Sequence, residues 1–291
     1  MAKKEREPLL YIACGKKGVG KTYTTKKVIN QYVGGNIITG AKPRKVLILD
    51  VNNEYTEYRR ISPSDIRRWT VNPYKEVRRI TPHDKDGRIL NISQLEEIFI
   101  DATVNFRNGL ILAEDLTKFV GDSLPAEIVA SLCTNRHTDV DIIAHFQSIG
   151  KSGHPKLKAN MNILRLHKCL DTVEYHKNKF TEYTEVLKIA EKLVNKRYDA
   201  FVKANRNLGQ TFFDFFVYID FDHTQIKGDF TKEEFQNVIT EYVQENENTT
   251  IIPILRIKDR GGIKKYSYGS ALTKAESEIF EKYAPNKFFG K

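Results

Sequence analysis

Residues 15–22 read GKKGVGKT, which matches the phosphate-binding pattern G-x-x-x-x-G-K-[ST]. In such a loop the glycines let backbone N–H groups turn toward phosphate oxygens, and the positive end of the following helix adds to the attraction. Lys21 would reach the β- and γ-phosphates, and Thr22 would offer a hydroxyl to Mg²⁺. The spacing therefore predicts a nucleoside triphosphate site, with ATP and Mg²⁺ as the expected cofactors.

The sequence on either side of this loop supports the same interpretation. Residues 9–14 are an apolar run typical of a buried parallel strand, and apolar residues recur at helical spacing over 28–33 before a Gly-Gly pair ends the helix. The residues predicted to contact the nucleotide are Gly15, Lys16, Lys17, Gly18, Val19, Gly20, Lys21, Thr22 and Tyr23.

Two carboxylates follow another apolar run. Residues 109–113 lead into Glu114 and Asp115, the form of a Walker B strand with its acids at the carboxyl end, where α/β proteins bind ligands. We expect Glu114 to contact the Mg²⁺ shell and Asp115 to orient or deprotonate the attacking water. The usual order is Asp then Glu, so the two roles are interchangeable, and an acidic pair at a helix N-terminus is the alternative. Asp50, which ends the apolar run 45–50, is a further candidate metal ligand.

Three more polar residues are candidates for the hydrolysis step. Gln147, just past the predicted strand 140–145, could hydrogen-bond the γ-phosphate or the attacking water. Arg136 precedes that strand and could act as an arginine finger on the nucleotide of a neighbouring subunit, and Arg165 is the other candidate. The alternative interpretation is a polar loop residue for Gln147 and surface residues for the arginines.

Composition limits the class of protein. The chain has 291 residues, 40% of them hydrophobic, so it can bury one large α/β core or two smaller ones. No apolar run approaches the length of a membrane span, and we expect no membrane partner and a cytoplasmic protein, in the host cell or associated with the virion if it is viral. Cys14, Cys133 and Cys169 are odd in number and lie far apart, as expected for reduced packing residues.

The charge favours a polyanionic partner. The formal net charge is +10 and the isoelectric point is near 9.3, and basic side chains gain free energy by displacing counterions from phosphates. Basic pairs occur at 59–60, 67–68 and 78–79, in a segment that also holds several aromatic residues. For any one pair a solvated face explains the charge equally well.

The order of elements predicts an α/β fold. Five apolar runs, at residues 9–14, 45–50, 110–113, 140–145 and 162–167, alternate with helical patterns, which fits a mostly parallel sheet flanked by helices. Residues 59–90 are predicted to be an irregular basic excursion from this core. A helix is expected to begin at a capping box formed by residues 93–96.

Residues 1–228 are predicted to form this core, including an amphipathic helix over 186–201 and an aromatic-rich strand near 212–220. Residues 229–291 are predicted to be a small α+β extension. It would open with a capping box and hydrophobic staple at 230–235 and contain a short strand at 251–257.

Taken together, residues 15–171 resemble the HerA/FtsK superfamily of P-loop ATPases. The resemblance is carried by GKKGVGKT, by LILDVNNEY at 47–55, by LILAED at 110–115 and by NRHTDVDIIAHFQS at 135–148. It is strongest to viral genome-packaging ATPases and Zot-like phage assembly proteins. The resemblance implies a RecA/FtsK-like core, a sensor role for Gln147 and a finger role in trans for Arg136. The chain departs from the family in the inverted Glu114-Asp115 pair and in AHFQ where Thr-Gln is more usual.

The resemblance implies an ATP-hydrolysing translocase of double-stranded DNA that assembles as a homo-oligomeric ring and docks on a capsid vertex or portal. The main alternative is a ParA/MinD-like partitioning ATPase, because Lys16 falls where that family has its second lysine, although Lys17 replaces a glycine of its pattern. The other alternative is a DNA-associated protein that keeps its nucleotide as a structural ligand; paired carboxylates argue against it.

Overall fold

The structure is a computed structural model that describes residues 7–36, 40–84, 86–116, 125–133, 138–205 and 213–289. The chain divides into two compact units, Met1–Asp171 with Phe212–Asp214, and Thr172–Thr211 with Phe215–Lys291. The division therefore falls after Asp171, whereas the sequence placed the boundary after residue 228. The reason is that the helix and hairpin between these two points bury their apolar sides with the C-terminal segment.

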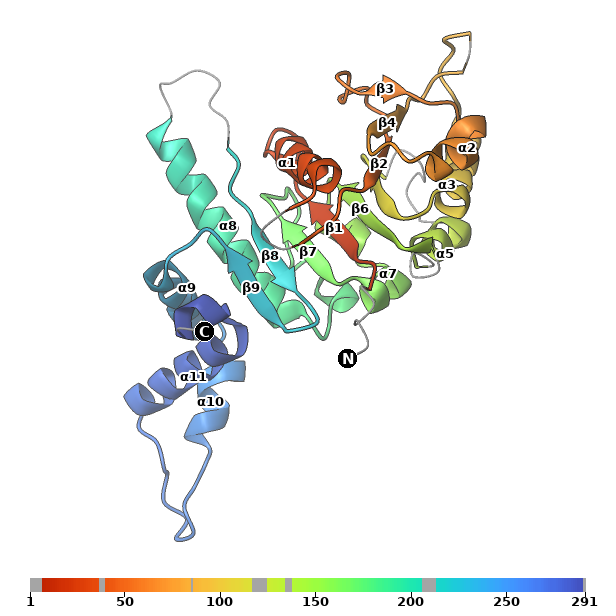
Figure 1. The fold of residues 1–291 in the computed structure, drawn as a ribbon. Helices are drawn as coiled ribbons and strands as arrows, with labels where there is room; N and C mark the ends of the chain where they lie inside the picture. Colours follow the sequence, from red (N-terminus) through yellow and green to blue (C-terminus); the bar gives the residue numbers. More distant parts are fainter. Residues whose placement is uncertain are drawn as a thin grey trace. The chain divides into compact units, whose positions relative to one another are not determined.

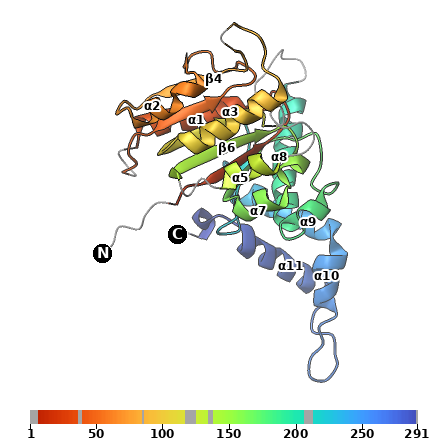
Figure 2. The ribbon, with the colours of Figure 1, turned by 90° about the vertical axis from the view of Figure 1, so that its right-hand side faces the viewer.

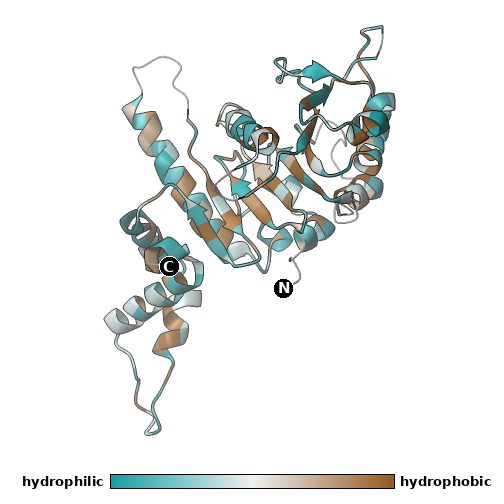
Figure 3. Ribbon diagram, viewed as in Figure 1, coloured by the Kyte–Doolittle hydropathy of each residue, from teal (hydrophilic) through white to brown (hydrophobic). Residues whose placement is uncertain are grey.

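The first unit is built on a parallel sheet with the strand order β3-β4-β2-β5-β6-β1-β7. Its strands are β1 (Leu10–Cys14), β2 (Lys45–Leu49), β3 (Arg59–Arg60), β4 (Val77–Ile80), β5 (Gly109–Ala113), β6 (Val140–Phe146) and β7 (Ile163–Leu166). Strands β2, β5 and β6 are buried along their whole length, as expected for a sheet covered on both faces. Figure 3 shows hydrophobic residues concentrated in these central strands. The predicted α/β fold and its five strands are confirmed.

Helices cover both faces of this sheet. Figures 1 and 2 show α1 (Lys21–Gly34) on one face and α3 (Ile92–Asn105), α5 (Ala126–Cys133) and α7 (Pro155–Asn160) on the other. Beneath α1, one buried cluster joins the helix to β2, β5 and β6; its members are Ile29, Val46, Ile48, Tyr55, Leu110, Leu112 and Ile143. Alternate residues of the strands contribute to it, because successive side chains point to opposite faces. The remaining short helices are η1 (Pro63–Asp65), α2 (Ile66–Val71) and α6 (Ile149–Ser152).

The strand order determines which loops meet. All these strands are parallel, so the loops that follow β1, β2, β5 and β6 leave the same edge of the sheet. Strand β6 lies between β5 and β1, with Ala113 opposite Ala144 and Cys14 opposite Phe146. The residues that end β6 are therefore placed between Glu114 and Asp115, which follow β5, and the loop that follows β1.

Residues 59–90 are not an excursion from the core, contrary to the sequence-based prediction. Strand β4 pairs with β2, and β3 adds the edge strand. The segment is anchored by Trp69, which stacks on Phe106 with ring centroids 5.5 Å apart. The buried Lys45 ammonium donates to the carbonyl oxygens of Trp69 at 2.7 Å and Thr70 at 2.8 Å, at the end of α2. Buried charged residues interrupt the apolar pattern from which buried strands are predicted, so the sequence did not predict this part of the sheet.

The start of α3 also differs from the prediction. The helix is capped by Asn91, whose side chain accepts from the Gln94 backbone while the Gln94 side chain accepts from the Asn91 backbone. The capping box therefore lies two residues before the predicted one at Ser93. Asn satisfies the first free N–H groups of a helix as well as Ser does, so both sites were chemically acceptable.

The second unit contains η3 (Lys177–Lys179), α8 (Thr184–Ala204), the antiparallel hairpin β8 (Val217–Asp220) and β9 (Gln225–Gly228), α9 (Lys232–Glu245), α10 (Glu247–Leu255), α11 (Tyr268–Tyr283) and η4 (Asn286–Phe289). The capping box predicted at α9 is confirmed, with Thr231 and Glu234 exchanging hydrogen bonds. Phe230 and Phe235 form the predicted staple, with ring centroids 5.4 Å apart.

The strand predicted at 251–257 is wrong, because most of this segment belongs to the helix α10. Thr250, Ile251 and Ile254 are its buried residues, and the helix packs against α9 and α11. A short apolar run rich in isoleucine fits a strand and a buried helix equally well, so its partners decide the conformation. No helix in the described parts of either unit is long and apolar enough to cross a bilayer.

Candidate nucleotide-binding and hydrolysis site

The phosphate-binding loop joins β1 to α1 and forms hydrogen bonds with the end of β6 and with His167 after β7. Gly18 and Gly20 have φ angles of 80° and 81°, in the left-handed region that a residue with a Cβ rarely adopts. The Gly15 amide donates to the Phe146 carbonyl at 3.1 Å, and His167 Nδ1 lies 2.8 Å from the Val19 carbonyl. A Cβ on Gly15 would lie 2.6 Å from that of His167, so only glycine fits there.

The Lys21 ammonium is folded back onto the loop. Its Nζ donates to the carbonyl oxygens of Gly15 at 2.5 Å and Lys16 at 2.8 Å. The residue is buried, and burial lowers its pKa, while the charges of Glu114 and Asp115 oppose the shift. The ammonium is thus kept at the loop by two hydrogen bonds to carbonyl oxygens, which phosphate oxygens would replace.

A cavity of about 540 Å³ lies over the loop, within the size range of small-ligand sites. Its lining residues are Lys17, Gly18, Gly20, Lys21, Thr22, Tyr23, Asn52, Glu54, Glu114, Asp115, His145, Phe146 and Gln147. Six of the predicted nucleotide contacts are in this set. Gly15, Lys16 and Val19 are not in the lining, and their carbonyl groups hold Lys21 and His167 instead.

Glu114 is buried at the end of β5 and is held by two neighbours. Its Oε2 accepts from the Tyr55 hydroxyl at 2.9 Å and lies 2.8 Å from His145 Nδ1. Burial by itself would raise the pKa of Glu114, but His145, the Tyr55 hydroxyl and Lys21 outweigh it, so the pKa is lowered. Burial and the Glu114 charge raise the pKa of Tyr55 well above its usual value, so the phenol keeps its proton. Glu114 is therefore a positioned carboxylate.

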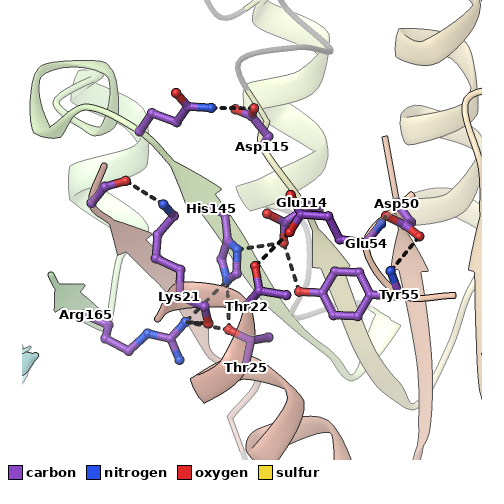
Figure 4. Close-up of polar contacts among 12 residues, drawn as sticks. Lys21, Thr22, Thr25, Asp50, Glu54, Tyr55, Glu114, Asp115, His145 and Arg165 are labelled. Atoms are coloured by element: carbon purple, nitrogen blue, oxygen red, sulfur yellow. Dashed lines mark hydrogen bonds and ion pairs between the residues drawn. The ribbon is translucent and has the colours of Figure 1, made fainter. Parts of the chain in front are cut away.

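Behind Glu114, a chain of buried polar side chains leads to α1 (Figure 4). His145 Nε2 lies 2.8 Å from the Thr25 hydroxyl, and Arg165 Nη2 lies 2.5 Å from the same hydroxyl. Arg165 Nη2 also donates to the Lys21 carbonyl at 3.3 Å. The side chains of three strands and the first turns of α1 are thus joined in one network.

Asp115 and Gln147 lie side by side in the wall of the cavity. The Gln147 amide Nε2 donates to Asp115 Oδ2 at 2.7 Å, and both residues line the cavity. Asp115 has a positive φ of 49°, which turns its side chain away from the direction taken by Glu114 (Figure 4). The turn after Gln147 is fixed by Asp171, which accepts from the Ser148 hydroxyl at 2.6 Å and the Gly150 amide at 3.0 Å. The structure therefore brings Asp115 and Gln147 together, a contact that the sequence analysis did not predict.

Asp50, the further candidate metal ligand, lies outside the cavity lining. Its carboxylate forms an ion pair with Arg79 at 2.8 Å and accepts from the backbone amides of Glu54 at 2.8 Å and Tyr55 at 3.1 Å. These contacts shape the loop after β2. They bring the Glu54 carboxylate within 3.0 Å of the Thr22 hydroxyl. Asp50 thus acts on the site indirectly, by placing Glu54 and Tyr55.

The two arginine-finger candidates have different outcomes. Arg165 is 1% exposed and is engaged by residues of its own unit, so it cannot reach a nucleotide bound to another subunit. Its prediction as a finger is wrong, because its strand β7 pairs with β1 and its side chain is buried against Lys21 and Thr25 of α1. Arg136 lies outside the described residues, and its role stays a prediction. No arginine lines the cavity among the residues that the structure describes.

Sequence reasoning missed His145, Thr25, Tyr55, Glu54 and Asn52 as site residues. His145 appeared in the sequence only as a departure from Thr-Gln, and Tyr55 and Glu54 only as letters of the quoted strand end. A histidine in an apolar run usually packs in a core. Its importance follows from β6 lying between β5 and β1, which only the sheet order establishes.

The donor set fits a hard divalent cation beside a triphosphate. Thr22, Glu54, Glu114 and Asp115 all offer oxygen atoms to the cavity. In the described ranges no cluster of three or more His, Cys, Asp or Glu could hold a metal by itself. Mg²⁺ typically takes one or two protein ligands and completes its shell with phosphate oxygens and water, which agrees with this arrangement.

Comparisons with known proteins give similarities of fold. No family model matches the sequence, and no curated protein matches it. The structure is similar to the genome-packaging NTPase B204 of Sulfolobus turreted icosahedral virus 2 in complex with ATP-gammaS, at 15% identity and a TM-score of 0.49, covering 77% of this chain and 97% of that one. It is also similar to the N-terminal domain of zonular occludens toxin from Neisseria meningitidis, at 16% identity and a TM-score of 0.27, covering 55% of this chain and 76% of that one.

A third similar structure is the ATPase DotB of Legionella pneumophila, at 12% identity and a TM-score of 0.35, covering 81% of this chain and 61% of that one. The chain itself carries the defining features of a phosphate-binding α/β fold: the loop at 15–22 joins β1 to the N-terminus of α1, and two carboxylates follow β5. The first unit has the P-loop NTPase fold.

Proposed function

We propose that the chain is an ATP-hydrolysing translocase of double-stranded DNA that acts as a homo-oligomeric ring and packages a viral genome. One observation carries the ATPase part of this proposal. The cavity over the phosphate-binding loop is lined by Lys21 and Thr22 from α1, by Glu114 and Asp115 after β5, and by Gln147 after β6. These are the parts that phosphoryl transfer needs for positioning and charge stabilisation.

Each residue has a role that follows from its contacts. Lys21 exchanges its carbonyl partners for the β- and γ-phosphates and stabilises the charge that develops during transfer. Asp115 and Gln147, joined at 2.7 Å, orient the attacking water. Thr22 and Glu114 would hold the Mg²⁺, which when bound neutralises phosphate charge. The Tyr55 and His145 contacts keep Glu114 ionised for this role.

The DNA part of the proposal rests on the basic segment, defined here as residues 59–75. Arg59, Arg60, Arg67, Arg68 and Lys75 are exposed in it, and Asp65 is its one acidic residue. None of the five basic side chains forms a hydrogen bond or ion pair with another described residue. Free guanidinium groups suit phosphate oxygens, and contacts to the backbone alone would give grip without sequence preference.

The ring part rests on the lining of the cavity. Its described cations are Lys17 and Lys21, and Arg165 is buried behind the loop. An arginine on the γ-phosphate would therefore have to come from outside the described residues of this subunit, and Arg136 of a neighbouring copy is the candidate. Docking on a capsid vertex or portal belongs to the same proposal. The ParA/MinD-like ATPase and the protein with a structural nucleotide remain the alternatives.

The test is steady-state ATP hydrolysis by the wild type and Lys21→Ala, each with and without linear double-stranded DNA, at low and moderate salt. Lys192→Ala, on the second unit, is the control for loss of a lysine. We expect DNA to stimulate hydrolysis in the wild type and the control, and Lys21→Ala to lose at least about 100-fold in kcat. Hydrolysis that ignores DNA would favour the partitioning ATPase, and nucleotide binding without hydrolysis would favour the structural nucleotide.

A further inference from the structure

We propose that His145 is a positioning residue that aims the Glu114 carboxylate into the nucleotide cavity and links it, through Thr25, to the helix that carries the phosphate-binding loop. The inference rests on the proposed function, because it assigns a task within the same site. His145 itself is fully buried at the end of β6. Its ring reaches both neighbours at once, Glu114 on one side and Thr25 on the other.

The network determines which ring nitrogen carries the proton. Arg165 has only N–H donors, so its contact at 2.5 Å makes the Thr25 hydroxyl an acceptor and leaves the hydroxyl proton for His145 Nε2 at 2.8 Å. Arg165 Nη2 also points a donor at Nε2 from 3.3 Å. Nε2 faces both of these donors, so a neutral imidazole in this arrangement carries its proton on Nδ1. This nitrogen lies 2.8 Å from Glu114 Oε2, within ion-pair distance although outside hydrogen-bond geometry, so Glu114 is the carboxylate beside its proton.

The charged groups around this network come from every element that packs against it. Glu114 belongs to β5, Lys21 to α1, and Arg165 and His167 to the strand β7 and its end, while Tyr55 follows β2. Burial, and then Arg165 and Lys21, lower the pKa of His167 far below its usual value, so His167 adds no positive charge. Lys21 and Arg165 supply the cations: the charge of Lys21 acts on Glu114, and Arg165 contacts Thr25 and His145.

This arrangement has a mechanical consequence. Thr25 lies one turn after Lys21 on α1, so a shift of this helix when phosphates enter the loop moves the hydroxyl that His145 contacts. The imidazole is rigid and has one acceptor and one donor, and it can pass that shift to Glu114 on its opposite side. Glu114 would then take its place at the Mg²⁺ only when the loop holds a nucleotide.

Two substitutions separate the two sides of the ring. His145→Asn places an amide N–H near the position of Nδ1 and keeps the donor to Glu114. His145→Gln extends to the position of Nε2, so it keeps the contact with Thr25 and loses the donor to Glu114. Both variants bury a polar amide of similar size and break one hydrogen bond. Thr25→Val and Thr25→Ser form a second matched pair, in which only serine keeps the hydroxyl.

The experiment measures four quantities for each variant: thermal melting, affinity for a fluorescent ADP analogue, the Mg²⁺ concentration for half-maximal ATPγS binding, and the pH profile of kcat. For His145→Gln we expect the Mg²⁺ requirement to rise and kcat to fall by about 10- to 100-fold. The acid limb of its profile should move to higher pH, because Glu114 loses a donor that favours its ionised form. His145→Asn should raise the Mg²⁺ requirement and lower kcat less than His145→Gln does, because it keeps the donor to Glu114.

Equal losses in the Asn and Gln variants, or a Gln variant with unchanged Mg²⁺ requirement and pH profile, would overturn the assignment. A loss of melting temperature alone would mean that His145 only packs the core. Thr25→Val should reduce the dependence of Mg²⁺ affinity on bound nucleotide, and Thr25→Ser should not. If the wild type binds nucleotide without hydrolysing it, the proposed function fails, and the Mg²⁺ titrations still decide the role of His145.

Discussion

The basic segment of the first unit and helix α8 of the second carry positive charge in different ways. None of the five exposed cations of residues 59–75 forms an ion pair with a carboxylate of the described residues, although the charge of Arg59 contributes to lowering the pKa of Glu76. On α8, four basic side chains each contact a carboxylate, in the pairs Lys188–Glu174, Lys192–Glu245, Lys196–Glu241 and Arg197–Glu234. Exposed ion pairs contribute little stability, but they cancel the field that a polyanion would feel. The net charge of +10 therefore acts mainly where it is unpaired.

The largest effect is expected at Arg79, the buried arginine that adjoins the basic segment. Arg79→Met should destabilise the first unit by about 3–5 kcal/mol, because it leaves the Asp50 carboxylate buried without its partner. Arg197→Met on α8 is the control and should cost at most about 1 kcal/mol, since its ion pair is exposed. Denaturant unfolding, followed by hydrogen exchange in each unit, measures both. Equal costs would mean that the Arg79 pair is no more important than a surface pair.

The second-largest effect is expected on DNA binding, when arginines of the basic segment are replaced. Replacing Arg59, Arg60, Arg67 and Arg68 by alanine should weaken binding to linear double-stranded DNA on the order of 100-fold at moderate salt. The slope of log K against log salt should fall by up to about 0.9 for each arginine that had neutralised a phosphate. Basal ATP hydrolysis should not change, because none of these residues lines the nucleotide cavity.

The matched control for DNA binding replaces the four ion-paired basic residues of α8, Lys188, Lys192, Lys196 and Arg197, by alanine. Its affinity for DNA should stay within about three-fold of wild type. If the α8 variant lost as much affinity as the arginine variant, DNA binding would depend on total charge. The difference between unpaired and ion-paired cations would then have no effect on binding. If the arginine variant bound DNA normally but no longer assembled, the basic segment would instead be a contact between subunits.

The smallest effect is expected on the titration of Glu174, the carboxylate that pairs with Lys188 of α8. Hydrogen bonds from Lys177 and Lys188 lower its pKa from 4.5 to about 2. Because the folded-state pKa is depressed, any stability from this carboxylate is present above pH 4.5 and is lost as pH falls toward 2. In a carboxyl NMR titration Glu174 should stay ionised near pH 3.5, where ordinary glutamates are largely protonated. Lys188→Met should move the transition toward the usual range, and an unchanged titration would show that the ion pair does not persist in solution.

Sequence patterns were sufficient for the features that depend on local chemistry. The phosphate-binding loop, the apolar strands beside it and the capping box at Thr231 each follow from residue types at fixed spacing, and the structure confirms them. The carboxylates and Gln147 were also found, because residues that end parallel strands must share one edge of the sheet.

Other features were decided only by the tertiary structure, because they depend on which elements become neighbours. The strand β4 contains Arg78 and Arg79, and in the sheet the buried Arg79 pairs with Asp50, the residue that follows β2. The segment at 251–257 is largely helical because α9 and α11 cover its apolar side. Nothing local to either segment specifies these partners.

The sequence by itself therefore determined that this chain has a phosphate-binding loop and which strand ends carry its acids. Only the tertiary structure decided what those acids contact: β6 between β5 and β1 places His145 against Glu114, and β7 beside β1 buries Arg165 behind the loop. The physical reason is the distance along the chain over which each property is determined. Backbone conformation and loop chemistry are set by sequence neighbours. The charge and orientation of a buried side chain are set by the residues packed around it, and Thr25 and His145 are more than a hundred positions apart.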